Sequence, residues 1–295
     1  MWSRKSDSGG SVMDLIPLTD SLGVEVRGFD VSAPGSAKDL AALRRAYAEH
    51  HLLLFRGQSL EDTAQEAFVA EFGPLVDDLG AGRYSAFISN VEMKDGGGGS
   101  GVLPFHSDLS FTHSPVHGIS LYALAIPEAG TTTRFVSGVA AAGDLPADLR
   151  ARVEGRSVNH VLPLSTDQPS AKAREVVVAD NDPRVTRPIL FEHPRNGATV
   201  LYVTDLHAHS IEGLGPDESA QLLDELFAHL YSEPHLYEHH WRIGDLVLWD
   251  NVALQHARAD VSRGGERTFR RASMNEFPII ELLPELIAMG VSETA

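Results

Sequence analysis

The sequence contains no cysteine among its 295 residues. This absence excludes disulfide bridges, iron–sulfur clusters and thiolate zinc sites, and it leaves histidine and carboxylate side chains as the strong metal ligands that the chain offers. It also agrees with a reducing compartment, so we expect a cytoplasmic protein.

Long apolar stretches and an excess of positive charge are also missing. No hydrophobic run approaches the roughly 20 residues needed to cross a bilayer, which argues against an integral membrane protein. The chain has 24 Lys and Arg against 41 Asp and Glu, a net charge of −17, and such a surface repels nucleic acid and anionic membranes. We therefore expect neither as a partner. A small anionic substrate stays compatible, because arginines inside a cleft outweigh distant charges at physiological salt.

The first residues are rich in Ser and Gly and lack the apolar core of a signal peptide. We expect residues 1–15 to form a disordered tail or to be a cloning remnant. No linker divides the remainder, and β-rich folds often reach this length undivided. Residues 16–295 are therefore expected to form a single domain, and the sequence leaves a homo-oligomer open.

Beyond the tail, the apolar pattern is mainly that of short strands interrupted by helices. Helical spacing is found at residues 37–50, 60–72, 145–153 and 217–231. Strand-like segments are 24–29, 52–55, 84–91, 120–126, 133–136, 189–192, 199–203, 246–249 and 269–274. This order predicts a mainly β fold with added helices, built on a double-stranded β-helix (jelly-roll, cupin-like) core. A glycine-rich run at 95–101 predicts a mobile loop beside a site.

His106, Ser107 and Asp108 form an H-x-D triplet. In a strand, residues i and i+2 point to the same face, so both side chains can reach one metal ion. A third ligand from a distant strand would complete a facial triad with open positions for a cosubstrate and O₂. The triplet alone is weak evidence, because surface polar pairs with this spacing are common.

A second segment of the sequence supports a metal site at this triplet. An apolar strand ends in Trp249-Asp250-Asn251, His256 lies six residues after Asp250, and Arg267 follows eleven residues later. This arrangement resembles the taurine dioxygenase and 2,4-dichlorophenoxyacetate dioxygenase family of Fe(II)/2-oxoglutarate enzymes. Residues 127–135 (PEAGTTTRF) and 193–203 (HPRNGATVLYV) also match ordered landmarks of that family, and the likeness covers roughly residues 23–277.

The resemblance implies a role for individual residues. His106, Asp108 and His256 would hold Fe(II). Arg267 would pair with the distal carboxylate of 2-oxoglutarate and Thr133 would donate a hydrogen bond to it, which suits a guanidinium fork and a hydroxyl. Arg271 would share a strand face with Arg267 and hold an acidic group of the substrate.

Several positions depart from the family pattern or are less certain. Thr131-Thr132 replace a Gly-Asp pair, and Phe105 replaces a tryptophan just before the first ligand, where it is expected to contact substrate. Asp77-Asp78 stand where taurine-specific enzymes have a histidine, which makes taurine improbable, and Asp78 is expected to face an amine of the substrate. His207 is a candidate substrate contact.

Structural explanations compete with functional ones at other positions. His239 and His240 would point to opposite faces of a strand and could not chelate one ion together. Trp249 is interpreted as core. Of the pair Arg270-Arg271, alternation along a strand turns only Arg271 toward Arg267.

The resemblance implies hydroxylation of a C–H bond in a small anionic or amino-acid-like molecule at an Fe(II) cofactor, with 2-oxoglutarate and O₂ consumed and succinate and CO₂ released. Asp108 favours oxygenation over halogenation, since related halogenases have a small residue there. Desaturation, epoxidation or cyclisation would leave the same ligands. A non-catalytic jelly-roll binding protein is the alternative from another class, although it would not need Arg267 and Thr133 together.

Overall fold

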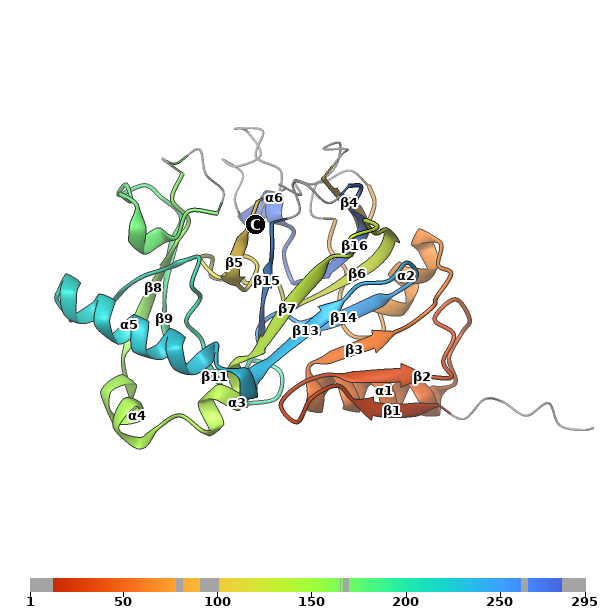
Figure 1. Ribbon diagram of the computed structural model, residues 1–295, viewed down its shortest axis with the longest axis horizontal. Helices are drawn as coiled ribbons and strands as arrows, with labels where there is room; N and C mark the ends of the chain where they lie inside the picture. Colours follow the sequence, from red (N-terminus) through yellow and green to blue (C-terminus); the bar gives the residue numbers. More distant parts are fainter. Residues whose placement is uncertain are drawn as a thin grey trace, which may run out of the picture.

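Two facing sheets form the centre of the computed structural model, which describes residues 13–77, 82–90, 101–164, 166, 170–260 and 265–282 (Figure 1). The larger sheet has the order β1 (Asp14–Pro17), β2 (Val24–Arg27), β3 (Leu52–Phe55), β14 (Leu246–Asp250), β6 (Gly118–Ala125), β16 (Thr268–Met274) and β4 (Ser85–Ser89). The smaller sheet has the order β13 (Leu236–His240), β7 (Thr132–Ser137), β15 (Leu254–Arg258) and β5 (Leu103–His106).

The main hydrophobic core lies between these two sheets. Alternate residues of the larger sheet, such as Leu121, Val247 and Phe269, pack there against Phe135 and Leu254 of the smaller one. Because strand side chains alternate between faces, each sheet needs a second cover on its outer side. Helices supply that cover.

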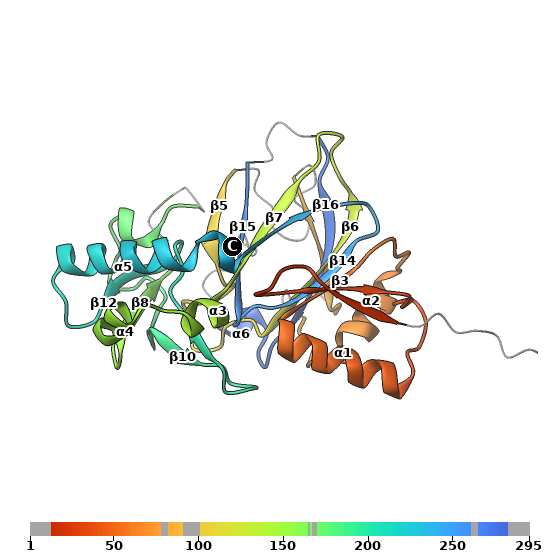
Figure 2. The same cartoon turned by 60° about the horizontal axis from the view of Figure 1, so that its bottom comes forward.

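The helices fall into two groups on opposite sides of the sheets (Figures 1 and 2). Two of them, α1 (Ala37–His50) and α2 (Asp62–Val69), pack on the outer face of the larger sheet. Beside the smaller sheet lie α3 (Gly138–Gly143), α4 (Ala147–Val153) and α5 (Pro216–Leu230). The apolar stripe of α5 faces this second core, as its spacing predicts. The remaining helical segments are η1 (Ala173–Glu175), η2 (Glu233–His235) and α6 (Ile279–Leu282).

Two small sheets extend the side that carries α5. One has the order β12 (Ala208–Ile211), β8 (Ser157–Val161) and β9 (Arg184–Pro188), and the other pairs β10 (Leu190–Glu192) with β11 (Thr199–Leu201). These strands enlarge the layer behind β5 and β15, the two strands that carry the predicted metal ligands.

The predicted mainly β jelly-roll fold with added helices is confirmed. One boundary was wrong: Asp14 and Leu15, assigned to the tail, belong to β1 and pair with Arg27 and Val26. Their backbone groups complete the edge of the larger sheet. Residues 1–12 and the glycine run at 95–99 lie outside the described residues. Among the helices that the structure describes, none has the length and apolar character needed to span a membrane.

Candidate functional site

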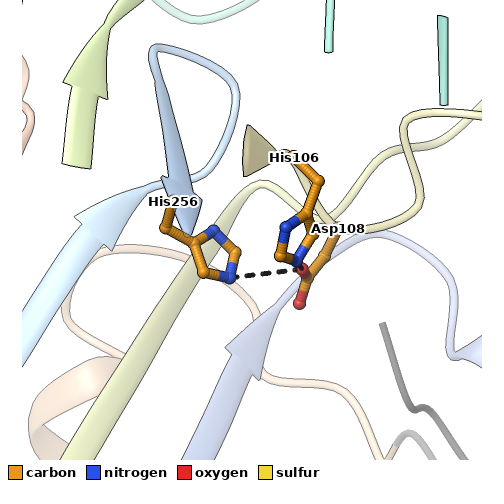
Figure 3. Close-up of side chains that lie close together, drawn as sticks. All are labelled: His106, Asp108 and His256. Atoms are coloured by element: carbon orange, nitrogen blue, oxygen red, sulfur yellow. Dashed lines mark ion pairs between the residues drawn. The ribbon is translucent and has the colours of Figure 1, made fainter. Parts of the chain in front are cut away.

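The H-x-D triplet and His256 meet where β5 pairs with β15. The two strands are antiparallel, and His256 lies directly opposite His106 in their register. Asp108 follows the end of β5, and its Oδ1 lies 3.2 Å from His106 Nε2 and 3.6 Å from His256 Nε2. Figure 3 shows the three side chains converging on one point. One ligand atom from each residue lies within 4.8 Å of the others.

The hydrogen bonds of this triad leave its inward atoms ready for a cation. His106 Nδ1 lies 2.8 Å from the carbonyl of Pro104, so Nδ1 carries the proton and the lone pair belongs to Nε2. His106 Nε2 and Asp108 Oδ1 are buried and have no hydrogen-bond partner within the described part of the chain. Two imidazole lone pairs facing a carboxylate oxygen repel one another unless a cation lies between them. The donor set of two nitrogens and one oxygen suits iron(II).

The protonation states of the triad also favour metal binding. Burial, and then the nearby His106, lower the pKa of His256 to about 3, which keeps its imidazole neutral. Burial alone would raise the pKa of Asp108, but Arg271 and the two histidines lower it well below its usual range. Asp108 and His256 are therefore held in the deprotonated forms that coordinate a metal.

Each residue of the Trp249-Asp250-Asn251 run has its own structural role. Trp249 packs against Phe135 and His256, with ring centroids 5.3 and 5.1 Å apart, so its interpretation as core holds. Asp250 accepts backbone N–H bonds from residues 252 and 253 and thereby shapes the turn into β15. Asn251 accepts the N–H of Asp108 at 3.0 Å and donates to its carbonyl at 3.1 Å. The motif thus positions both the strand of His256 and the backbone of Asp108.

Arg271 lies beside the triad. Its Nη2 is 2.9 Å from Asp108 Oδ2, the oxygen turned away from the histidines, and its Nε donates to Ser273 Oγ at 3.0 Å. Arg270 faces the other side of β16, where it donates to Gln65 and to the carbonyl of Leu60. The alternation predicted for this arginine pair is confirmed.

Arg267 is a buried cation without a carboxylate partner among the described residues. Only 4% of its surface is exposed, its Nε has no hydrogen-bond partner in the described chain, and its guanidinium stacks 4.3 Å from the Phe269 ring centroid. Burial, and then the positive charge of Arg258, lower the pKa of Arg267 to about 9. Since an uncompensated buried charge is costly, Arg267 marks a place for an anion, with the positive charge of Arg258 nearby.

Thr133 is oriented by a neighbouring indole. Its Oγ1 accepts a hydrogen bond of 2.9 Å from Trp241 Nε1, and it is directly opposite Arg258 in the pairing of β7 with β15. Because an indole N–H only donates, the Thr133 hydroxyl must point its own hydrogen elsewhere. Trp241 also packs on Phe269, at 4.6 Å between ring centroids, which connects Thr133 to the ring that stacks under Arg267.

The three expected substrate contacts other than Arg271 have different outcomes. Phe105 is not brought to the triad: as the strand neighbour of His106 it points to the opposite face, where it stacks 4.5 Å from Tyr231. The contact expected for Phe105 is therefore corrected to a core position. His207 is buried behind the triad, 6.3 Å from His106 between ring centroids, and its Nδ1 is 2.9 Å from Ser110 Oγ. Asp78 lies outside the described residues.

Sequence reasoning missed Trp241, Arg258 and the bonding role of Asn251. Arg258 could have been found, because it lies two residues after His256 and so shares its strand face. Trp241 gave no such signal, since its contact with Thr133 depends on the pairing of β13 with β7. The alternation at His239 and His240 was anticipated: His239 is buried and His240 exposed.

Comparison with known proteins agrees with this geometry. The chain matches the family described as "Taurine catabolism dioxygenase TauD, TfdA family" over residues 14–273. It is 33% identical to the (S)-phenoxypropionate/alpha-ketoglutarate-dioxygenase of Sphingobium herbicidovorans, over 82% of this chain and 88% of that protein. It is 29% identical to the alpha-ketoglutarate-dependent 2,4-dichlorophenoxyacetate dioxygenase of Cupriavidus pinatubonensis, over 87% and 96% of the two chains.

A solved structure shows the same likeness. The crystal structure of a taurine dioxygenase from Burkholderia xenovorans superposes with a TM-score of 0.75 at 25% identity, covering 89% of this chain and 90% of the other. The predictions of an enzyme and of 2-oxoglutarate (alpha-ketoglutarate), iron and O₂ as its requirements are confirmed at the level of the family. With a family match over nearly its whole length, this chain belongs to the TauD/TfdA family of 2-oxoglutarate-dependent dioxygenases.

Proposed function

We propose that this enzyme oxidises a C–H bond of a small organic acid, with succinate and CO₂ formed from 2-oxoglutarate. His106, Asp108 and His256 would hold Fe(II). The convergence of their ligand atoms supports this assignment, as does the lack of a hydrogen-bond partner for His106 Nε2 and Asp108 Oδ1 among the described residues. Bound iron supplies O₂ activation and the oxidising power for the C–H bond. The protein residues supply charge, orientation and a site shielded from water.

The cosubstrate would lie between the triad and Arg267. Arg267 and Thr133 would bind its distal carboxylate, because the first is a buried cation in need of an anion and the second has its hydrogen directed by Trp241. Arg258, opposite Thr133, would add positive charge at the same end. These contacts suit a dicarboxylate better than a monocarboxylic keto acid.

The proposal of an anionic substrate depends on one observation: a buried guanidinium, that of Arg271, lies 2.9 Å from the outer oxygen of Asp108. It places a positive charge next to the metal position, on the side away from the two histidines. The two relatives named above, whose names specify phenoxy acids, support this substrate class.

A binding experiment and a turnover experiment test the proposal. Anaerobic addition of Fe(II) and 2-oxoglutarate should produce the weak visible charge-transfer band of a chelated keto acid, and His256→Ala should abolish it. A panel of carboxylates, sulfonates, sulfate esters and neutral analogues should then be screened by succinate release. Stimulation by neutral analogues alone would refute an anionic substrate.

The neighbouring arginines provide a matched pair of variants. Arg271→Gln removes the charge beside Asp108 and should lower kcat/KM for the anionic substrate roughly 10- to 100-fold, the worth of a charge-assisted hydrogen bond, while substrate-independent 2-oxoglutarate turnover persists. Arg270→Gln removes the same charge from the opposite face of β16 and should affect stability but not substrate preference. Equal loss of activity in both variants would contradict the assignment.

We also propose that residues 16–295, now with Asp14 and Leu15, act as one domain. The candidate site draws on β5, β7, β15 and β16, which are spread along most of the chain and share one core. A single thermal transition, followed by both circular dichroism and loss of activity, is expected. Two separable transitions would oppose it.

A further inference from the structure

A second group of possible metal ligands lies away from the triad. Asp144 directly follows α3, His229 is in the last turn of α5, and His235 ends η2. One ligand atom from each of these three residues lies within 4.8 Å of the others. Three elements that are separate in the sequence thus bring two imidazoles and one carboxylate together.

The distances suit coordination of one ion. His235 Nε2 lies 3.0 Å from each carboxylate oxygen of Asp144, and His229 Nε2 lies 3.3 Å from Asp144 Oδ1. His229 Nε2 also lies 2.8 Å from the carbonyl oxygen of Ala141, to which it donates in the metal-free chain, so coordination through Nε2 would move the ring proton to Nδ1. Ligand atoms around zinc with bonds of about 2.0–2.1 Å are separated by about 2.9–3.4 Å, from octahedral to tetrahedral geometry.

The tautomer of His235 directs a lone pair at Asp144. Its Nδ1 lies 3.1 and 3.2 Å from the carbonyl oxygens of residues 229 and 230, which accept only, so Nδ1 carries the proton. In the neutral ring, Nε2 then faces two carboxylate oxygens without a hydrogen to offer. Either a second proton or a cation must lie between them. His235 is 2% exposed whereas the Asp144 side chain is 60% exposed, so the group has a fixed inner ligand and an open side.

We propose that Asp144, His229 and His235, with the carbonyl of Ala141, bind a divalent first-row transition ion such as Zn²⁺. Two imidazoles and hard oxygen donors favour such an ion over calcium or magnesium, and water would fill the solvent side. The ion would be structural: it would join α3 and α5 to η2, which leads directly into β13. Because β13 pairs with β7 at Thr133, the ion would brace the edge of the sheet that carries the cosubstrate residues.

Zinc stoichiometry tests the proposal independently of catalysis. Metal-free protein, dialysed against micromolar Zn²⁺ and analysed for metal, should bind two ions per chain. His256→Ala, which disables the triad, should bind one. Asp144→Ala and His229→Ala should likewise bind one, and the double variant His256→Ala with Asp144→Ala should bind none. Asp144 is exposed and His229 lies at the surface end of its helix, so both single variants are expected to fold.

Controls distinguish the site from general zinc binding by surface groups. Glu233→Ala and Asp148→Ala remove exposed acidic groups near the site, and His240→Ala removes an exposed histidine; all three should keep two ions. Zn²⁺ should also raise the Tm of His256→Ala but not that of the double variant. A single ion in the unmodified chain that Asp144→Ala retains, or an ion kept by the double variant, would overturn the proposal and assign Asp144 and His235 to a simple ion pair.

Discussion

Replacing Asn251 by Asp should weaken metal binding without touching a ligand. The Asn251 amide donates to the carbonyls of Val116 and Asp108, at 2.8 and 3.1 Å, and accepts the Asp108 N–H. Aspartate retains the acceptor but turns an oxygen toward two carbonyl oxygens. The lost bonds and unpaired acceptors should cost roughly 2–4 kcal/mol of unfolding free energy. A loosened Asp108 should lower Fe(II) affinity about 10- to 100-fold, as for other residues that orient ligands.

Gln255 offers a matched control for this change. Its buried amide donates to the carbonyl of Val203 at 2.7 Å and accepts from the Tyr231 hydroxyl at 2.9 Å, on the strand face opposite to His256. Gln255→Glu should therefore cost comparable stability but leave the metal affinity unchanged. Urea unfolding gives the first quantity, and anaerobic Fe(II) titration with saturating 2-oxoglutarate gives the second. Wild-type Fe(II) affinity in Asn251→Asp, or equal weakening in Gln255→Glu, would refute the reasoning.

Three further predictions concern charge and orientation. Arg267→Leu should raise KM for 2-oxoglutarate roughly 10- to 100-fold. The unfolding free energy of the metal-free protein should stay equal or rise, because a buried uncompensated charge is removed. A large loss of stability would show that Arg267 has a structural partner. Trp241→Phe keeps an aromatic ring but releases the Thr133 hydroxyl, so KM for 2-oxoglutarate should rise about 5-fold, the worth of one hydrogen bond, with kcat little changed; steady-state kinetics decide this. In the folded chain, burial lowers the pKa of His160 to about 3. In the unfolded chain, this histidine has its ordinary pKa of 6.5 and takes up a proton below that pH, so the unfolding free energy falls as the pH drops. Between pH 7 and 5.5, the unfolding free energy of His160→Gln, measured with urea, should fall by roughly 1 kcal/mol less than that of the wild type. An equal fall in both proteins would argue against a neutral buried His160.

The fold and the metal residues could be predicted because their signals are local in the sequence. The two-residue spacing predicts that His106 and Asp108 lie together, although β5 ends at His106 and Asp108 belongs to the turn that follows. The Trp249-to-Arg267 spacing identifies the partner strands. Strand alternation also shows why Phe105, one residue before His106, packs in the outer core. Residue spacing alone therefore argues against a contact between Phe105 and the substrate.

Other parts of the site depend on contacts between distant segments. The bond from Trp241 to Thr133 requires the register of β13 on β7, and the pairing of Arg271 with Asp108 requires β16 to lie across from the end of β5. Neither of these arrangements can be predicted from the residue spacing within one segment. The Asp144 group is a third case, because it forms only where three helical ends meet.

The positions of Arg267 and Arg271 on one extended segment have a consequence for cosubstrate length. Four residues of extended chain span about 13 Å; Arg271 lies within β16 and Arg267 directly precedes it. One arginine lies at the proposed metal end and the other at the proposed carboxylate end, so this segment would set the distance from the metal to Arg267. A four-carbon keto acid held at the metal would stop short of Arg267. Selection of a five-carbon cosubstrate would then follow from the pitch of a β-strand.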